Sequence, residues 1–152
     1  MIQEVSMQKP IVLVVDDNTA HLQICKTLIG DRYTIYVADS AKTMFDFLES
    51  ILPDLILLDI MMPTLNGFEA VKQLKDDETY CNIPVIFLSS ITDESSEAEG
   101  YALGAADYIH KPFVPHQLIR RIDTQLELSN HKKDIRMLYG VLSEMLNKNI
   151  YE

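Results

Sequence analysis

The sequence predicts an α/β fold: a five-stranded parallel sheet, doubly wound by helices on both faces, with an extended helix at the C-terminal end. Two observations lead to this prediction. Short apolar runs alternate along the chain with stretches of helical period. Most of these runs also lack the period-two alternation of a half-exposed strand, which is typical of strands buried on both faces of a parallel sheet.

Each expected strand is a short apolar run rich in β-branched residues. The first and third runs end on carboxylates, at Asp16 and Asp59, and the fourth ends on the hydroxyls of Ser89 and Ser90. The fifth is followed closely by Lys111. The predicted strands are residues 11–15, 33–38, 55–59, 83–88 and 105–109.

The expected helices carry apolar residues three or four positions apart. Asn18 or Thr19 can cap the first helix, and Gly30 ends it. Pro53 closes the second, whereas the fourth has low helix propensity and a thin apolar face. The predicted helices are residues 19–29, a segment after Ser40 with Met44, Phe45, Leu48 and Ile51 at helical spacing, 68–75, 94–103 and 115–148.

Length and charge limit the classes of function. The 152 residues suffice for one domain with a full core plus an appendage, and are too few for two complete domains. The formal net charge is -10, and the segment from residue 116 on holds only 5 of the 23 acidic residues, so the acidity belongs to the front domain. Because nucleic acids and anionic membranes are polyanions, direct binding to either is disfavoured, whereas a cation is a natural ligand.

Cysteine usage and the absence of targeting signals predict a cytoplasmic protein. Cys25 and Cys81 are isolated thiols without metal-ligand spacing. The first ten residues hold no apolar core segment and no small-residue cleavage site, and no run approaches the length of a membrane span. We therefore expect a reducing environment and no association with a membrane.

Polar groups meet at one edge of the predicted sheet. Asp16, Asp17, Asp59, Ser89 and Lys111 all stand at or just after strand ends, and the carboxyl ends of parallel strands share an edge where ligand sites form. A single Asp there is usually a helix cap, a single Ser a turn residue and a single Lys a surface charge. Chemically matched groups on four strands favour a functional site.

Four motifs give the chain a specific family resemblance. They are Val-Val-Asp-Asp-Asn at the first strand, Leu-Asp-Ile-Met-Met-Pro-Thr-Leu-Asn-Gly-Phe-Glu around Asp59, Leu-Ser-Ser after the fourth strand, and Gly-Ala-Ala-Asp-Tyr-Ile-His-Lys-Pro-Phe around the fifth. In this order they resemble the receiver domain of bacterial two-component response regulators, the CheY-like group. The resemblance covers residues 9–128 and implies the flavodoxin-like strand order 2-1-3-4-5. Residues 1–8 are then an N-terminal tail, and residues 129–152 a helical extension.

The resemblance implies a role for each matching residue. Asp59 is the implied phosphoacceptor, and Mg²⁺, or Mn²⁺ in its place, is implied to bind Asp16, Asp17, Asp59 and the main-chain carbonyl of Met61. The implied partner is a cognate sensor histidine kinase or a phosphotransfer protein. Ser89, with the adjacent Ser90, is the implied switch hydroxyl that binds the phosphoryl group, and Tyr108 is the implied switch aromatic. Lys111 matches the invariant lysine of the family, and the resemblance implies a cis peptide bond between Lys111 and Pro112.

The chemistry of phosphoryl transfer explains why these residue types are needed. Three clustered carboxylates repel one another, and a hard divalent cation with oxygen ligands relieves that repulsion. An aspartate that attacks a phosphoryl group is itself anionic, so the cation and Lys111 must offset charge on the transferring oxygens. We expect Lys111 to pair with Asp59 at rest and with a phosphoryl oxygen afterwards. The chain would then be a phosphoacceptor that assists its own modification, and not an enzyme.

Two positions depart from many members of the family. Met61 and Ile91, two residues after Asp59 and Ser89, are apolar where many relatives are polar, so neither can orient a hydrolytic water. We therefore expect a long-lived phosphorylated form. Four histidines lack paired ligand spacing and receive no role: His21, His110, His116 and His131.

Two other protein classes share parts of this pattern. A phosphohydrolase of the haloacid-dehalogenase type also uses a strand-end aspartate with Mg²⁺, but it needs Asp-X-Asp, and Asn18 and Thr19 stand where the second acid belongs. A flavodoxin-like nucleotide or flavin binder needs a glycine- or hydroxyl-rich phosphate loop after the first strand. The sequence Asp-Asp-Asn-Thr-Ala would repel a phosphate there unless a metal intervened.

The last helix is longer than one domain needs. Its apolar residues from Leu128 on recur at alternating three- and four-residue steps, interrupted by the polar His131. This pattern predicts a parallel homodimer through the C-terminal helix; the alternative is a helix that folds back on its own domain with a bend at Gly140. The chain could act alone through protein contacts or be the receiver part of a longer protein. Similar tails in the family lead into diguanylate cyclase, phosphodiesterase or kinase modules, and the sequence selects none of them. The expected seam is formed by Leu128, Ile135, Leu138, Leu142 and Met145.

Overall fold

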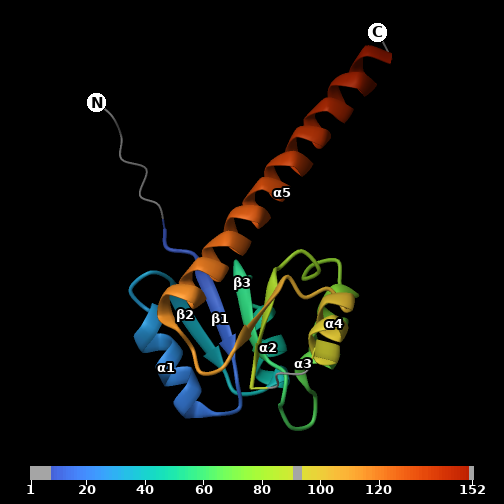
Figure 1. Ribbon diagram of the computed structural model, residues 1–152. Helices are drawn as coiled ribbons and strands as arrows, with labels where there is room; N and C mark the ends of the chain where they lie inside the picture. The colour runs from blue at the N-terminus through green and yellow to red at the C-terminus, as the bar shows by residue number, and fades with distance from the viewer. Residues whose placement is uncertain (1–7, 91–93, 151–152) are drawn as a thin grey trace, which may run out of the picture.

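Five parallel strands form one sheet at the centre of the structure, a computed structural model that describes residues 8–90 and 94–150 (Figure 1). The strands are β1 (Ile11–Val15), β2 (Thr34–Ala38), β3 (Leu55–Asp59), β4 (Val85–Ser89) and β5 (Asp107–His110). The helices are α1 (Thr19–Ile29), α2 (Ala41–Leu48), α3 (Gly67–Lys75), α4 (Glu94–Ala102) and α5 (Pro115–Ile150). The strand order β2-β1-β3-β4-β5 confirms the predicted doubly wound α/β fold. The predicted tail, residues 1–8, lies outside the described residues apart from Gln8.

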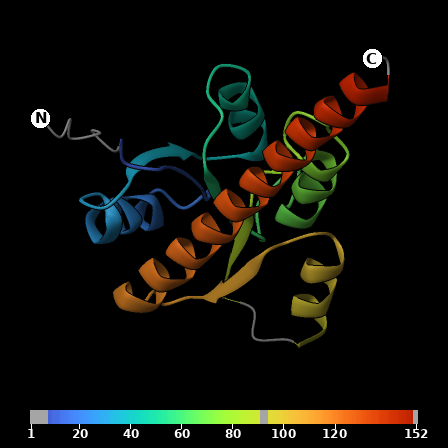
Figure 2. The same ribbon diagram turned by 90° about the horizontal axis from the view of Figure 1, so that it is seen from above.

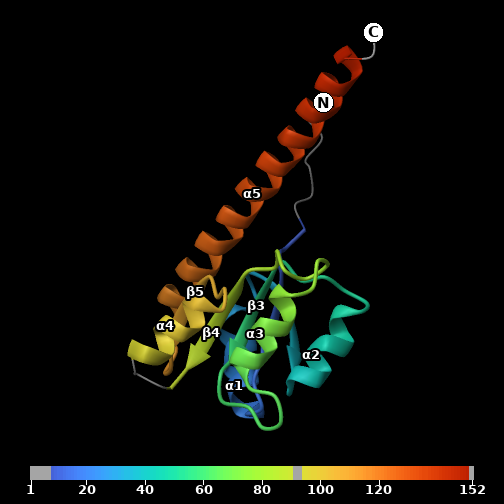
Figure 3. The ribbon, with the colours of Figure 1, turned by 90° about the vertical axis from the view of Figure 1, so that its right-hand side faces the viewer.

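Helices cover both faces of the sheet. α1 and α5 pack on one face, and α2, α3 and α4 lie on the other (Figures 2 and 3). Every residue of β3 and β4 is buried, which explains why both strands are apolar up to their last residues, Asp59 and Ser89. β2 forms an edge of the sheet and exposes Tyr36 and Val37. The acidic strand ends therefore emerge from the most protected part of the fold.

The start of α1 is set by a side-chain cap. Asn18, rather than Thr19, is the capping residue, because its side chain accepts hydrogen bonds from the main-chain N–H groups of Ala20 and His21. Gly30 follows the last residue of the helix, as predicted, and takes a right-handed φ of -65°. The cap places the first turn of α1 directly beside the end of β1.

Several element bounds differ from the predicted ones. β4 and β5 each begin two residues later and end one residue later than predicted, so Ser89 and His110 are strand residues. Ile83 and Ala105 are buried although they lie outside the sheet, which shows that an apolar run reports burial and not strand pairing. α2 ends at Leu48, so Ile51 lies outside the helix and is only partly buried. The polar residues after each run still reach the edge of the sheet.

α5 is much longer than the domain that it packs on. Leu118 and Ile122 in its first turns are fully buried against the sheet. From residue 130 to residue 149 every side chain is exposed, and the helix projects away from the body of the protein (Figure 3). It continues through Gly140 as one helix, so a tail bent back at that residue is not what the structure shows. The residues of the predicted seam are all exposed: Leu128, Ile135, Leu138, Leu142 and Met145.

Candidate functional site

Three carboxylates converge at the carboxyl edge of the sheet. Asp16 follows β1 directly, and Asp59 is the last residue of β3; the parallel register that pairs Val15 with Leu58 brings the two side by side. Asp17 is the exposed member of the group, whereas Asp16 and Asp59 are buried. One carboxylate oxygen from each residue lies within 4.8 Å of those from the other two. The strand ends thus bring together the three acids that the sequence singled out.

The loop after β3 folds back tightly against the strand end. The main-chain N–H of Gly67 donates to the carbonyl of Ile60, and a Cβ at Gly67 would lie 2.5 Å from the carbonyl oxygen of Asp59. Only glycine fits so close to the backbone. Asn66 then caps α3 in a capping box with Glu69. The Asn-Gly pair of the sequence therefore holds the loop against the phosphoacceptor candidate.

Met61 is the residue of this loop that the sequence implicated in metal binding. Its main-chain N–H donates a hydrogen bond to the carboxylate of Asp59. Its side chain is 64% exposed, and a thioether is at most a weak hydrogen-bond acceptor. The side chain of Met61 is thus open to solvent near Asp59 and offers no strong polar group to a water molecule.

Lys111 enters the site from the end of β5. Its amine donates to Asp16 Oδ2 over 2.8 Å and lies 3.7 Å from Asp59 Oδ1. Its main-chain N–H donates to the carbonyl of Ser89, and the peptide bond from Lys111 to Pro112 is cis, as the family resemblance implied. The lysine is within ion-pair distance of Asp59, as expected, but its hydrogen bond is made with Asp16.

His21 is a member of this cluster that sequence reasoning left without a role. Its Nδ1 lies 3.1 Å from Asp16 Oδ2 and 2.9 Å from the amine of Lys111. This nitrogen can accept from Lys111 or donate to Asp16, but one tautomer cannot do both. The position of His21 in the sequence could have indicated this role. Side chains in an α-helix tilt toward its N-terminus, so a histidine in the first turn after Asp16 reaches back to the end of β1.

The two buried acids differ in how their charges are compensated. Burial raises the pKa of Asp16, but hydrogen bonds from Lys111 and from the Asn18 N–H, with the charges of Lys111 and His21, outweigh it, so the pKa lies below its ordinary value. Burial and then the negative charge of Asp16 raise the pKa of Asp59 to about 6. Lys111 therefore compensates the charge of Asp16 better than that of Asp59.

A divalent cation fits this donor set. The three acids supply hard oxygen ligands, which Mg²⁺ and Mn²⁺ prefer over nitrogen or sulfur. The exposed carboxylate of Asp17 leaves one side open to solvent, which suits Mg²⁺ because this ion usually keeps several waters. Burial and then the charge of Asp16 raise the pKa of Asp59 despite Lys111, and a bound cation would offset both effects.

The predicted switch residues lie beside the acidic cluster. Ser89 ends β4 and is buried, whereas Ser90 is exposed. Tyr108 is buried in this structure, with its ring centroid 5.8 Å from that of Phe87. Ile91, the second apolar departure from the family pattern, lies outside the described residues.

Comparison with known proteins agrees with this geometry. The family model of the response regulator receiver domain matches residues 12–123. The chain is 34% identical over 131 residues to hybrid signal transduction histidine kinase D of Dictyostelium discoideum, and 34% identical over 140 residues to a probable cyclic di-GMP phosphodiesterase of Vibrio cholerae. These alignments cover 86% and 92% of this chain but 8% and 30% of the two relatives, so the chain spans less than a third of either protein.

A solved structure shares the fold. It is the receiver domain of a sensor histidine kinase from Pseudomonas aeruginosa, with a magnesium ion coordinated in its active-site cleft. The sequences are 22% identical, the TM-score is 0.72, and the match covers 78% of this chain and 98% of that one. The family match, the strand order and the acidic cluster lead to one conclusion: this chain belongs to the response regulator receiver family and contains a phosphoacceptor signalling domain.

Proposed function

We propose that Asp59 receives the phosphoryl group and that Mg²⁺ is bound by Asp16, Asp17, Asp59 and the main-chain carbonyl of Met61. The observation that carries this proposal is the cluster of three acids with the Lys111 amine 3.7 Å from Asp59. The cation and Lys111 would offset the charge that builds up on the transferring oxygens. Mn²⁺ could take the place of Mg²⁺, since it prefers the same oxygen ligands.

Each residue around Asp59 has a proposed task. Asp59 would be the nucleophile, and its pKa is raised by burial and by the charge of Asp16, both of which the positive charge of a metal ion would offset. Ser89 and the adjacent Ser90 would donate hydrogen bonds to phosphoryl oxygens. Lys111, now bonded to Asp16, would turn to a phosphoryl oxygen after transfer, because it already lies near Asp59. His21 would then be the remaining neighbour of Asp16.

Labelling by a small phosphodonor tests the proposal directly. With acetyl phosphate and Mg²⁺, the intact chain should take up label and the Asp59→Asn variant should not. Asp17→Ala should weaken Mg²⁺ binding markedly, because it removes one of three charged ligands. Asp39→Asn is the matched control, since Asp39 also follows a strand but is not part of the cluster. Label on Asp59→Asn equal to that on the parent would refute the assignment.

We further propose the bounds and partners of the protein. Residues 9–128 would form the receiver, after a tail of residues 1–8, and residues 129–152 a helical extension that pairs two copies in parallel. A sensor histidine kinase or a phosphotransfer protein would supply the phosphoryl group. The output could be a diguanylate cyclase, phosphodiesterase or kinase module, and the chain itself would act as a phosphoacceptor and not as an enzyme.

The proposed location is the cytoplasm, where the free thiols of Cys25 and Cys81 would stay reduced. Within the ranges 8–90 and 94–150, no helix has both the length and the apolar character that a membrane span requires. The acidic receiver would not bind nucleic acid directly, because its net charge repels a polyanion.

A further inference from the structure

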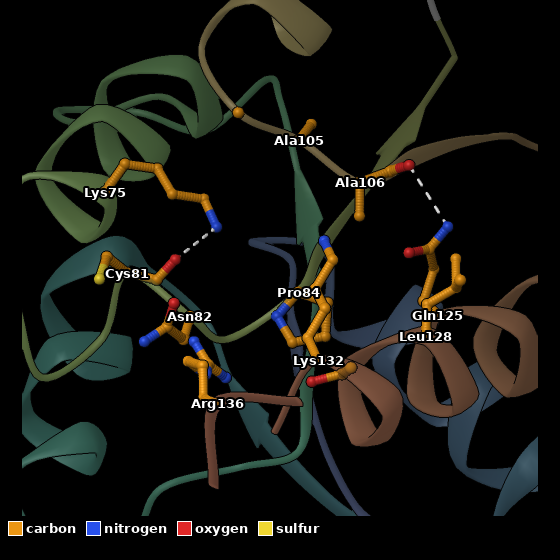
Figure 4. A pocket seen from close by; sticks show the side chains of 12 residues that line it. Lys75, Cys81, Asn82, Pro84, Ala105, Ala106, Gln125, Leu128, Lys132 and Arg136 are labelled. Carbon is orange, nitrogen blue, oxygen red and sulfur yellow. Dashed lines mark hydrogen bonds between the residues drawn. The ribbon is translucent and has the colours of Figure 1, made fainter. Parts of the chain in front are cut away.

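A polar pocket lies at the opposite edge of the sheet from the acidic cluster around Asp59. It is a cavity of about 250 Å³ at the point where the chain enters β4 and β5 and where α5 leaves the body of the protein (Figure 4). Its walls come from the end of α3, the loop before β4, the loop before β5 and the third to sixth turns of α5. The residues that matter for its chemistry are Lys75, Asn82, Pro84, Ser129, Lys132 and Arg136.

The charge of this pocket is opposite to that of the chain. Lys75, Lys132 and Arg136 line it, and no Asp or Glu is among the described residues of its wall. The whole chain holds 23 acidic residues against 13 basic ones, so a wall with three cations and no acid departs from the composition. Within the described part of the chain, none of the three cations forms an ion pair with a carboxylate.

Lys75 is held in the wall by the backbone of the neighbouring loop. Its amine donates to the carbonyls of Cys81, over 3.0 Å, and Ile83, over 3.2 Å, which leaves a third N–H group for a ligand. Burial lowers the pKa of Lys75; the interaction with Cys81 opposes this shift, and the positive charge of Lys132 adds to it. The cations therefore repel one another across the cavity, and a bound anion would relieve that repulsion.

Neutral groups complete the wall. Asn82 and Ser129 offer polar side chains to the same cavity, while the side-chain amide of Gln125 is occupied by a hydrogen bond to the carbonyl of Ala106. Pro84 supplies an apolar surface. A volume of about 250 Å³ is close to the lower end of the range for small-molecule sites. The cavity thus combines cations, polar donors and an apolar patch.

We propose that this pocket binds a small phosphate-bearing anion through Lys75, Lys132 and Arg136. Lysine and arginine side chains are the usual ligands of phosphate, and a di- or polyphosphate can engage more than one of them. Lys132 and Arg136 lie on one face of α5, four residues apart, whereas Lys75 belongs to the end of α3. The bound anion would therefore link the first exposed turns of α5 to the body of the receiver, independently of Asp59.

Titration with pyrophosphate tests the site. The intact chain, with a chelator present so that no metal ion bridges the ligand to the acidic cluster, should show saturable binding by calorimetry. Lys132→Gln and Arg136→Gln should each weaken it about tenfold, which is about 1.4 kcal/mol. Both side chains are exposed, so the fold should tolerate these changes. Lys148→Gln removes the same charge near the far end of the same helix and should leave the affinity unchanged.

Three results would overturn the proposal. The first is the absence of saturable binding by the intact chain, and the second is equal weakening of binding by all three substitutions. The third comes from NMR: amide chemical-shift changes on adding pyrophosphate that map to Asp16 and Asp59 instead of residues 81–84 and 104–106. A parallel titration with ADP distinguishes the source of the anion. Tighter binding of ADP supports an organic phosphate that also uses Pro84, and tighter or equal binding of pyrophosphate supports an inorganic one.

Discussion

At the scale of single residues, the pairing of Asp16 with Lys111 leaves Asp59 as a source of instability in the metal-free protein. Burial and the negative charge of Asp16 raise the pKa of Asp59 from its ordinary value of 3.8 to about 6. The folded protein thus holds this proton more tightly than the unfolded chain does. The stability of the metal-free protein should fall as the pH rises from about 4 to about 6, and remain lower above that range.

Asp59→Asn should remove this penalty. Without divalent cations at pH 7, we expect the free energy of unfolding to rise by about 2 to 3 kcal/mol, and its fall between pH 4 and pH 6 to become smaller. Urea unfolding at several pH values, with a chelator present, measures both effects. Asp39→Asn serves as the control, because Asp39 is exposed and lies outside the cluster. A variant no more stable than the parent at pH 7 would contradict this account of Asp59.

Met61 leads to a second prediction at this scale, about the lifetime of the phosphorylated form. Its exposed thioether cannot hold a hydrolytic water in line with the phosphoryl group. We expect Met61→Asn to speed loss of the label about tenfold, which corresponds to about 1.4 kcal/mol of the barrier. The measurement is decay of phosphorylated protein after removal of the donor. Met137→Asn, at an exposed position of α5, is the control, and equal lifetimes in parent and Met61→Asn would exclude the mechanism.

At the scale of elements, α4 is the part of the structure best placed to respond to phosphorylation. Its residues include Ser95, Ser96 and Gly100, which have low helix propensity, and Gly100 packs against Phe87 and Tyr108. One polar tie to β5 runs from Glu97 to His110 over 2.6 Å, between side chains that are both partly exposed. A surface pair of this kind contributes little to stability, so α4 can shift at low cost in free energy.

α4, β5 and the start of α5 form one face of the domain, and on the α5 side of this face Asp107 makes two side-chain hydrogen bonds. Arg121 donates to Asp107 over 2.7 Å, and Asp107 also accepts a hydrogen bond from Tyr101 of α4. Asp107 is the residue that α4, β5 and α5 share. A movement of α4 would therefore alter the partners of Asp107 and reach α5 through Arg121.

Amide exchange tests this arrangement. Adding beryllium fluoride with Mg²⁺, which mimics the phosphoryl group, should change exchange rates in α4, β5 and the first turns of α5, because an anion bound at Asp59 biases an existing equilibrium. α2 (Ala41–Leu48) is the internal control, since it packs beside β2 at the other end of the sheet. Unchanged exchange in α4 and β5, or an equal change in α2, would count against a switch at this face.

At the scale of the whole molecule, the long exposed stretch of α5 carries a row of apolar side chains that the single chain leaves in contact with solvent. Its seam residues recur at the spacing of a coiled coil and are between 47% and 62% exposed in the single chain. A second copy with the same seam would cover them. A parallel arrangement would deliver both C-termini to the same side, where a paired output module could act.

Light scattering on intact and shortened chains tests the dimer. We expect the intact chain to be a dimer at tens of micromolar, and a chain that ends at Leu126 to be a monomer. Leu138→Lys should dissociate the intact dimer, because it places a charge in the apolar seam. Met137→Lys introduces the same charge outside the seam and should leave the dimer intact. An intact chain that stays monomeric, with or without phosphorylation, would exclude the proposed stalk.

The fold class, the strand order implied by the family resemblance, and the edge at which Asp16, Asp17 and Asp59 meet were all predictable from the sequence alone. These features depend on local periodicity and on one general rule, that the carboxyl ends of parallel strands share an edge. Element bounds were less certain, because Ile83 and Ala105 are apolar for burial in the core and not for pairing in the sheet.

Contacts between side chains that are far apart in the sequence could be seen only in the folded structure. Lys111 bonds to Asp16 across 95 positions and contacts His21 across 90, and neither contact leaves a local pattern. The basic pocket likewise joins Lys75 to Lys132 and Arg136. Periodicity reports which face of an element is buried, but such contacts depend on how α1, α3 and α5 pack on the sheet and on the directions of long, flexible side chains.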